Sequence, residues 1–306
     1  MIRVFLTSFA ISVGLVGSLS AEMLKVQSIA PNVWALEGPA ENRNAENLGN
    51  NATFGLIETT QGAVLVDPGG SYNGAAAIDA VISTLTDQPV KFVINTGGQD
   101  HRWLGNGYWQ AKGAQVIASQ NAHADHQDRA SMQLTVLSQL IGDDGLKGTE
   151  PSVPDITFDG SYELTLGETV ISIHNPFAAH TPGDSFVWLA ASKTVFTGDI
   201  VYVGRVLGIM DFSSSSEWIE AFDAMAALEP EYLVPGHGPA TTLAVAKADT
   251  YDYLVSLREQ IGAHIEEGGD IIDAVKVDQS AFAHLAQFDA LAGRNAQRVF
   301  EEMEWE

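Results

Sequence analysis

The sequence contains no cysteine among its 306 residues. Disulfides therefore cannot stabilise the fold, and any metal site must take its ligands from His, Asp, Glu or neutral donors. Basic residues are also few, because 15 Lys and Arg stand against 39 Asp and Glu, which gives a formal net charge of −24. This charge argues against nucleic acid and anionic membrane surfaces as partners. It does not by itself establish a preference for cationic substrates.

A long apolar run occurs only at the beginning of the sequence. Arg3 precedes an apolar stretch over residues 4–16, and small residues follow up to Ala21. This pattern predicts a secretory signal peptide over residues 1–21, cleaved after Ser20 or Ala21. The stretch is short for a membrane-spanning helix, which needs about 20 apolar residues. We therefore expect a periplasmic or secreted protein that has no membrane anchor after cleavage.

The rest of the sequence, residues 22–306, is expected to form one domain with helices at its C-terminal end. Hydrophobic residues make up 45% of the chain and charged residues 18%, which is typical of a globular protein with a substantial core. Apolar periodicity in the first half predicts strands at 32–36, 53–58, 63–66, 90–95 and 114–118, and helices at 75–85, 103–112 and 121–141, the last with Asn121 as a possible cap.

The second half has a similar arrangement without repeating the sequence. Strands are predicted at 156–158, 162–164, 169–173, 185–190, 194–196 and 232–234, and helices at 216–228, 243–266, 270–275 and 280–303. Two half-sets of strands, each followed by helices, indicate two packed sheets with helices outside. The fold class is therefore α/β or α+β.

Polar side chains that can bind metal lie in loops at the ends of predicted strands. One loop contains Asp100 and His101, a second contains His180, and a third group places Asp199 and His237 beside glycine. Glycine and proline next to these residues can hold a side chain at a fixed angle. Imidazole and carboxylate groups are the natural zinc ligands of a protein without cysteine.

Taken together, these motifs resemble the metallo-β-lactamase superfamily in order and in local sequence, over about residues 28–245. The matching segments are Val64 to Gly69, Asp100-His101 with Leu104-Gly105-Asn106, His180 to Asp184, Thr197-Gly198-Asp199, and Pro235 to Gly238. The resemblance implies a four-layer αββα sandwich. It also implies a metal site built from five residues, Asp100, His101, His180, Asp199 and His237.

The first motif departs from the pattern His-x-His-x-Asp-His of that superfamily, because Thr96 and Gly98 stand where two histidines are usual. In two-metal members those histidines and the one at position 180 hold the first metal. The resemblance thus implies a single zinc ion bound by Asp100, His101 and His237, with Asp199 as a fourth or bridging ligand. A second ion is doubtful, and His180 is expected nearby, as a weak ligand or as a partner of the substrate.

The predicted function is a zinc hydrolase in which metal-bound hydroxide attacks the amide, ester or thioester carbonyl of a small molecule. Asp100 or Asp199 would orient the water and accept its proton, and His180 would assist. Two carboxylates also leave iron or manganese as alternative metals. The competing interpretation is a non-catalytic member of the same fold that binds a metal or small ligand. The oligomeric state stays open.

Other residues have secondary predicted roles. The variant first motif is similar to a branch associated with quinoprotein systems and sulfur oxidation, and Asp67 is expected to hold loops beneath the site. Trp103, Tyr202 and Trp218 are candidates for lining a pocket.

The segment from Asn121 to His126 looks superficially like the missing histidine motif. It begins a long helix, so we expect His123 and His126 to share a solvated face.

Overall fold

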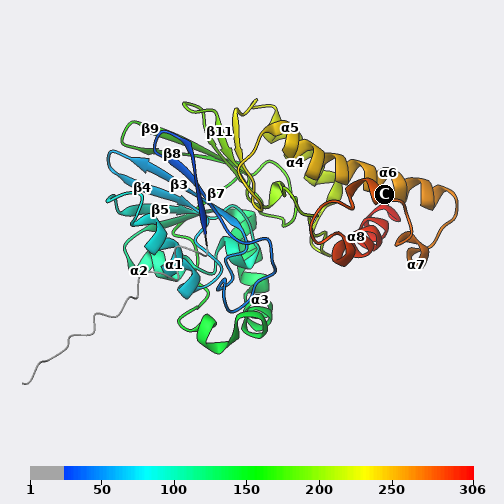
Figure 1. The fold of residues 1–306 in the computed structure, drawn as a ribbon, viewed down its shortest axis with the longest axis horizontal. Coiled ribbons are helices and arrows are strands. Elements are labelled where there is room, and N and C mark those ends of the chain that lie inside the picture. The colour runs from blue at the N-terminus through cyan, green and yellow to red at the C-terminus, as the bar shows by residue number, and fades with distance from the viewer. Residues whose placement is uncertain (1–23) are drawn as a thin grey trace, which may run out of the picture.

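The computed structural model describes residues 24–306, and the predicted signal peptide over residues 1–21 lies outside them. The strands form a seven-stranded and a five-stranded sheet, with helices outside both (Figure 1). Within residues 24–306, no helix combines the length and the apolar character that crossing a bilayer requires.

The first sheet follows the chain order. Its strands are β1 (Lys25–Ala30), β2 (Val33–Glu37), β3 (Thr53–Thr59), β4 (Gly62–Val66), β5 (Val90–Ile94), β6 (Gln115–Ser119) and β7 (Ile156–Phe158). Pairing is antiparallel from β1 to β4 and parallel from β4 to β7. The parallel part requires crossover connections, and these contain the helices α1 (Tyr72–Ile82), α2 (Asn106–Ala111) and α3 (Gln120–Leu146).

The second sheet has the order β12-β11-β10-β9-β8. Its strands are β8 (Ser161–Leu166), β9 (Thr169–His174), β10 (Phe186–Leu189), β11 (Thr194–Phe196) and β12 (Tyr232–Val234), and β12 joins parallel to β11 after helix α4 (Ser215–Ala226). The C-terminal helices are α5 (Leu243–Ala246), α6 (Asp252–Glu266), α7 (Ile271–Ala274) and α8 (Phe288–Met303). They extend away from the sheets as a separate arm in Figure 1.

Strand β4 shows how the layers arise. Its residues are all buried, but alternate side chains point to opposite faces of the sheet. Val64 and Val66 join the core between the two sheets, whereas Leu65 packs with Ile78 of α1 and Trp109 of α2. The far face of the second sheet packs against helices α4, α6 and α8. The result is the predicted four-layer αββα order.

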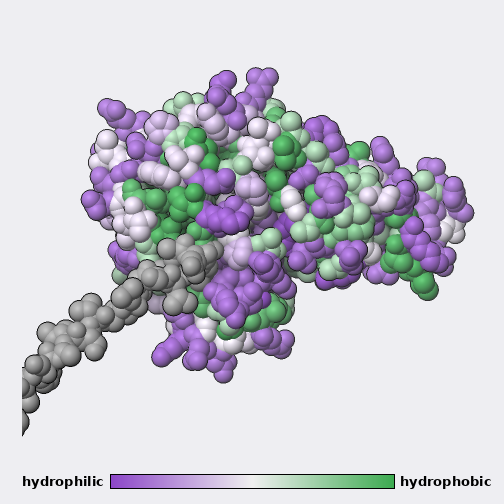
Figure 2. Space-filling view, in the orientation of Figure 1, coloured by the Kyte–Doolittle hydropathy of each residue, from purple (hydrophilic) through white to green (hydrophobic). Residues whose placement is uncertain are grey.

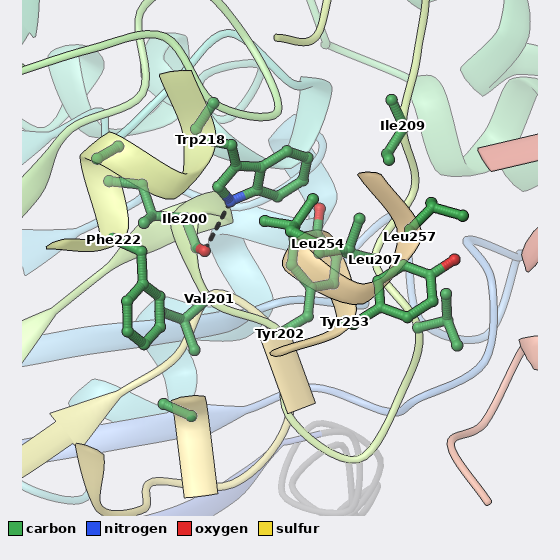
Figure 3. Close-up of a cluster of buried hydrophobic side chains, with 14 of the residues drawn as sticks. Ile200, Val201, Tyr202, Leu207, Ile209, Trp218, Phe222, Tyr253, Leu254 and Leu257 are labelled. Atoms are coloured by element: carbon green, nitrogen blue, oxygen red, sulfur yellow. Dashed lines mark hydrogen bonds between the residues drawn. The ribbon is translucent and has the colours of Figure 1, made fainter. Parts of the chain in front are cut away.

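The largest core cluster joins the second sheet to the helical arm. Trp218 and Phe222 of α4 lie four residues apart and belong to the same cluster as Leu254 and Leu257 of α6 (Figure 3). Trp218 also donates a 2.8 Å hydrogen bond from its indole nitrogen to the carbonyl of Ile200.

Hydrophilic residues cover much of the surface seen in Figure 2, with apolar groups between them.

Most helix boundaries differ by a few residues from those predicted, and three helices show why. Helix α3 begins at Gln120 because the Ser119 hydroxyl, and not Asn121, accepts the hydrogen bond from the Ala122 amide. The predicted helix over 243–266 contains a π-helical turn at Lys247–Tyr251. The predicted helix over 280–303 is regular only from Phe288 onward.

Candidate metal centre

Three side chains from the ends of different strands converge in the structure. His101 lies in a 3-10 turn (Asp100–Arg102) after β5, Asp199 lies in a 3-10 turn (Gly198–Ile200) after β11, and His237 follows β12. One nitrogen or oxygen atom of each lies within 4.8 Å of those of the others. Nε2 of His101 is 3.3 Å from Oδ2 of Asp199, and Nε2 of His237 is 3.2 Å from Oδ1. Both sheets therefore contribute to one cluster.

Hydrogen bonds on the outer side of each imidazole set its orientation. Nδ1 of His237 lies 2.9 Å from the carbonyl of Asn51, and Nδ1 of His101 lies 3.1 Å from Oδ1 of Asp100. With Nδ1 as the donor in each ring, Nε2 is left as an acceptor that faces the cluster. Burial also holds the pKa of His237 well below its usual value. This imidazole is therefore neutral near pH 7, as metal binding requires.

The carboxylate of Asp199 is held by Arg102, whose guanidinium is fully buried. Arg102 donates 2.7 Å hydrogen bonds to Oδ1 of Asp199 and to Oδ2 of Asp67, and a 2.9 Å bond to the carbonyl of Gly236. Burial alone would raise the pKa of Asp199, but the charge of Arg102 and the nearby His101 outweigh it, so the pKa lies well below the usual value. Asp199 is therefore ionised.

Glycine at position 236 is required by this packing. A Cβ atom there would lie 2.6 Å from a guanidinium nitrogen of Arg102 and 2.1 Å from the carbonyl oxygen of Gly198. The Pro-Gly-His sequence thus lets Arg102 pass directly beneath the residue before His237. Asp67, which also accepts hydrogen bonds from Thr96, has the structural role that the sequence predicted.

The cluster contains two buried polar atoms without a hydrogen-bond partner, namely Nε2 of His101 and Oδ2 of Asp199. Such orphaned groups are costly unless an ion or water satisfies them. Two imidazoles and one carboxylate form a known donor set for zinc and for non-haem iron, with coordination positions left open. Among residues 24–306, this trio is the one group of three or more side chains placed to hold a metal. The residues therefore fit a single ion.

Asp100 lies outside this trio, which departs from the expectation that it binds the metal directly. Arg43 contacts both of its oxygens, at 2.9 and 2.7 Å, and the amide and ring of His101 contact Oδ1. Burial opposes ionisation here, but Arg43 and His101 keep the pKa of Asp100 well below its usual range. In this arrangement Asp100 positions His101, as carboxylates behind metal-binding histidines commonly do.

His180 also lies outside the trio but lines the same pocket. Its Nδ1 is 2.9 Å from the carbonyl of Gly208, which leaves Nε2 for the pocket, and burial lowers its pKa to about 4. The ring lies 6.1 Å from that of Tyr202 and 5.7 Å from that of Trp218, measured between centroids. This placement is compatible with the expected role as a partner of the substrate.

The pocket has a volume of about 310 Å³ and opens onto the trio. Its lining includes His101, His180, His237 and Tyr202, and Tyr202 stacks on His237 with ring centroids 4.6 Å apart. Of the three aromatic residues considered from the sequence, Tyr202 alone lines this pocket. Trp103 and Trp218 are 1% and 0% exposed and belong to the core.

Helix α3 closes one of the two positions where other members of the superfamily have first-metal histidines. Thr96 bonds to Asp67 through its hydroxyl, and a Cβ atom on Gly98 would lie 1.6 Å from Oδ2 of Asp125. The carbonyl of Gly98 accepts hydrogen bonds from Arg129 and Gln133 of the same helix. Thr96 is therefore committed to Asp67, and at position 98 no space remains for any side chain.

The prediction that His123 and His126 share a solvated face is wrong for His126, whereas His123 is partly exposed. Asp125 and His126 are buried, Asp125 pairs with Arg129, and His126 stacks on Trp103 at 4.5 Å and lies 3.0 Å from the carbonyl of Gly97. The sequence does contain a signal for this burial. Ala122, His126, Gln133 and Leu137 recur at helical spacing and form the buried stripe.

Sequence reasoning also assigned no role to Arg102 and Arg43, which hold the two acidic residues of the site. Arg102 stands between His101 and the apolar pair Trp103-Leu104. An arginine within a buried segment needs acidic or carbonyl partners there. The apolar neighbours of Arg102 could therefore have indicated that it binds an acidic residue of the site. Arg43 lies 57 residues before Asp100, and no local pattern connects the two.

Replacing Gly98 with histidine should not create a second metal site. We expect Gly98→His to lower the free energy of unfolding by about 2 kcal/mol or more, because the imidazole must displace Asp125 and Arg129. Metal content per chain should not rise. Gly107→Ala is a matched control, since a Cβ there meets Ser152 at an ordinary 3.7 Å. Urea unfolding and elemental analysis measure both quantities, and a stable variant with two ions would contradict this account.

The buried His126 should make stability depend on pH. Burial lowers its pKa to about 4, below the unfolded value of about 6.5. Between these values the unfolded chain binds more protons, so His126 reduces stability as pH falls, by up to about 3 kcal/mol. His126→Phe keeps an aromatic ring against Trp103 without the titrating group. Urea unfolding at pH 7 and pH 4.5 should show a smaller loss for the variant, and equal losses would refute the prediction.

Comparison with known proteins agrees with this geometry. The family model described as the metallo-beta-lactamase superfamily matches residues 49–237. No curated relative matches the sequence. A metallo-beta-lactamase from Pontibacter korlensis has a similar structure, with a TM-score of 0.60 and 21% identity, covering 73% of this chain and 95% of its own.

Two further solved structures extend the comparison. The metallo-beta-lactamase FIM-1 from Pseudomonas aeruginosa, in its mono-zinc form, matches with a TM-score of 0.56 and 21% identity over 73% of this chain and 92% of its own. The inverting sec-alkylsulfatase Pisa1 from Pseudomonas sp. matches with a TM-score of 0.69 and 13% identity, over 92% of this chain and 51% of its own. From the family match, and in agreement with the fold and the converging ligands, we conclude that this chain belongs to the metallo-beta-lactamase superfamily.

Proposed function

We propose that this protein is an exported hydrolase that binds one zinc ion and cleaves an amide, ester or thioester bond of a small molecule. The observation that carries the proposal is the convergence of His101, Asp199 and His237 on a pocket, with two buried donor atoms lacking partners. Three protein ligands and an open coordination position are typical of catalytic zinc. Export rests on the apolar N-terminal pattern of residues 1–21.

The residues around the trio suit hydrolysis. A divalent ion held there would polarise a substrate carbonyl and make water acidic enough to act as a nucleophile near pH 7. Asp199 has one oxygen fixed by Arg102 and presents the other, Oδ2, to the site. His180 is neutral and has Nε2 free, so it can accept a hydrogen bond or a proton in the pocket. Asp100 is occupied by Arg43 and His101, which leaves it a positioning role.

The alternative to be tested is a binding protein of the same fold without catalysis. It is favoured by the absence of the two imidazoles of the first metal motif, because Thr96 stands at one position and no space remains for a side chain at the other, Gly98. A panel of lactams, thioesters, lactones and phosphoesters separates the two candidates. Turnover of any one of them supports the hydrolase. Bound metal without turnover of any supports the binding protein.

Iron and manganese are the alternative metals for this donor set.

Metal content should follow the trio and not the neighbouring residues. The purified protein should contain about one zinc per chain, and His237→Ala or Asp199→Ala should lose it and its activity. Asp100→Ala should bind zinc about 10- to 100-fold more weakly, as expected for a group behind a ligand. His284→Ala, on the surface of the arm, is the control. Elemental analysis and competition with a chelator measure these effects, and unchanged metal content in both ligand variants would end the proposal.

A further inference from the structure

Two arginines line the pocket without an acidic partner. Arg205 donates a hydrogen bond only to the carbonyl of Ala40, at 3.5 Å, and its Nε is buried without a partner. The one hydrogen-bond contact of Arg294 is with the sulfur of Met210, at 3.8 Å. Within residues 24–306 neither forms an ion pair, whereas each of the other five arginines there does. Both guanidinium groups are thus available to a ligand.

This arrangement is unusual for a chain with so few basic residues. Only 15 Lys and Arg face 39 Asp and Glu, so an acidic partner is readily available to most cations. Arg43 lines the same pocket. The pKa of Arg205 is lowered mainly by the burial of its own side chain, and the nearby positive charge of Arg43 also lowers it. Gathering like charges costs free energy unless an anion compensates them. The pocket is therefore a basic site within an acidic protein.

The two segments that carry these arginines, the loop around Arg205 and helix α8, are joined by hydrogen bonds and form what we call the basic wall of the pocket. Val206 donates to the carbonyl of Ala286, and Ala286 donates to that of Gly204, at 2.9 and 3.0 Å. Asn295 of α8 bonds to the carbonyl of Leu207 and the amide of Ile209. The loop bearing Arg205 and the helix bearing Arg294 are therefore joined, which reduces the cost of ordering them around a ligand.

Helix α8 contributes one face to the pocket. Ala290, Leu291 and Arg294 of this helix line the pocket, and the spacing of four and three residues to Arg294 places them along one side of it. Gln287, the residue just before the helix, lines the pocket as well. This helix follows residue 237, where the family match ends. The residues that close the pocket on this side therefore come from the C-terminal arm of this chain.

The basic wall lies next to the metal centre. The guanidinium of Arg205 is 5.9 Å from the ring centre of Tyr202, which in turn stacks on His237. Met210 and Leu291 add apolar surface to the same pocket. A small organic molecule can thus reach the trio at one end and the arginines at the other.

Building on the hydrolase proposed above, we propose that its substrate carries an anionic oxygen group, a carboxylate or sulfate, which Arg205 and Arg294 bind while the scissile bond lies at the trio. Guanidinium groups match the planar or tetrahedral geometry of such groups and form charge-assisted hydrogen bonds to them. The acidic net charge of the chain does not oppose this preference, because the local charge of the pocket is positive.

Kinetics with matched substrates tests the proposal. The aryl monoester of glutaric acid keeps a free carboxylate, and its methyl-capped diester does not. Wild type should prefer the monoester, and Arg205→Gln or Arg294→Gln should raise KM for it about tenfold or more, with little change for the diester. Arg205→Lys should recover part of the effect. Arg298→Gln, one turn further along α8 and paired with Glu301, is the matched control. Equal changes for both esters would overturn the proposal.

A binding measurement keeps this test separate from the hydrolase proposal. Glutarate and inorganic sulfate, added to the purified full chain at constant ionic strength, should raise Tm of wild type and Arg298→Gln, and less so that of Arg205→Gln and Arg294→Gln. The stronger of the two anions identifies the group. If no ester is cleaved but these shifts appear, the hydrolase fails and the anion site stands. Equal shifts in all variants, or none in wild type, would reject the anion site.

Discussion

The buried guanidinium of Arg102 is the interaction on which the rest of the site depends. It contacts Asp67 after β4, Asp199 after β11 and the carbonyl of Gly236 after β12, so one side chain joins loops of both sheets. A guanidinium without water is costly unless charged partners surround it. Removal of either carboxylate would leave Arg102 poorly compensated. The positive charge of Arg102 therefore holds the loops that carry Asp199 and His237 in place, because Arg102 stays buried only while these loops supply its hydrogen-bond acceptors.

The same arrangement explains why the site suits one cation. Two carboxylates flank one guanidinium. The free oxygen of Asp199, Oδ2, lies 3.3 Å from Nε2 of His101, and both atoms lack a hydrogen-bond partner, while Nε2 of His237 lies 3.2 Å from Oδ1. A divalent ion would satisfy these atoms together. Helix α3 fills the neighbouring space with the Asp125–Arg129 pair, against the backbone of Gly98. An ion pair thus occupies the space that a histidine side chain at position 98 would require.

The sequence predicted the layers and most of the strands because alternation in strands such as β4 is a local pattern. It also predicted His101, Asp199 and His237, since Asp199 and His237 stand beside glycine and His101 follows Gly97-Gly98 in a loop at a strand end. It did not predict that Asp100 would turn to Arg43, because that contact joins residues 57 positions apart. Nor did it predict the buried Asp125 and His126, where polar side chains occupy a helical stripe that is normally apolar. Long-range ion pairs leave little local signature, and a buried helical stripe is hard to recognise when several of its residues are polar.

The position of the bound metal tests the central claim most directly. Crystals of the purified protein, measured at the absorption edge of the metal, should show one anomalous peak about 2.0–2.2 Å from Nε2 of His101, Nε2 of His237 and a carboxylate oxygen of Asp199. A second peak beside Thr96, Gly98 and His180, or a single peak that none of the three side chains contacts, would contradict the account.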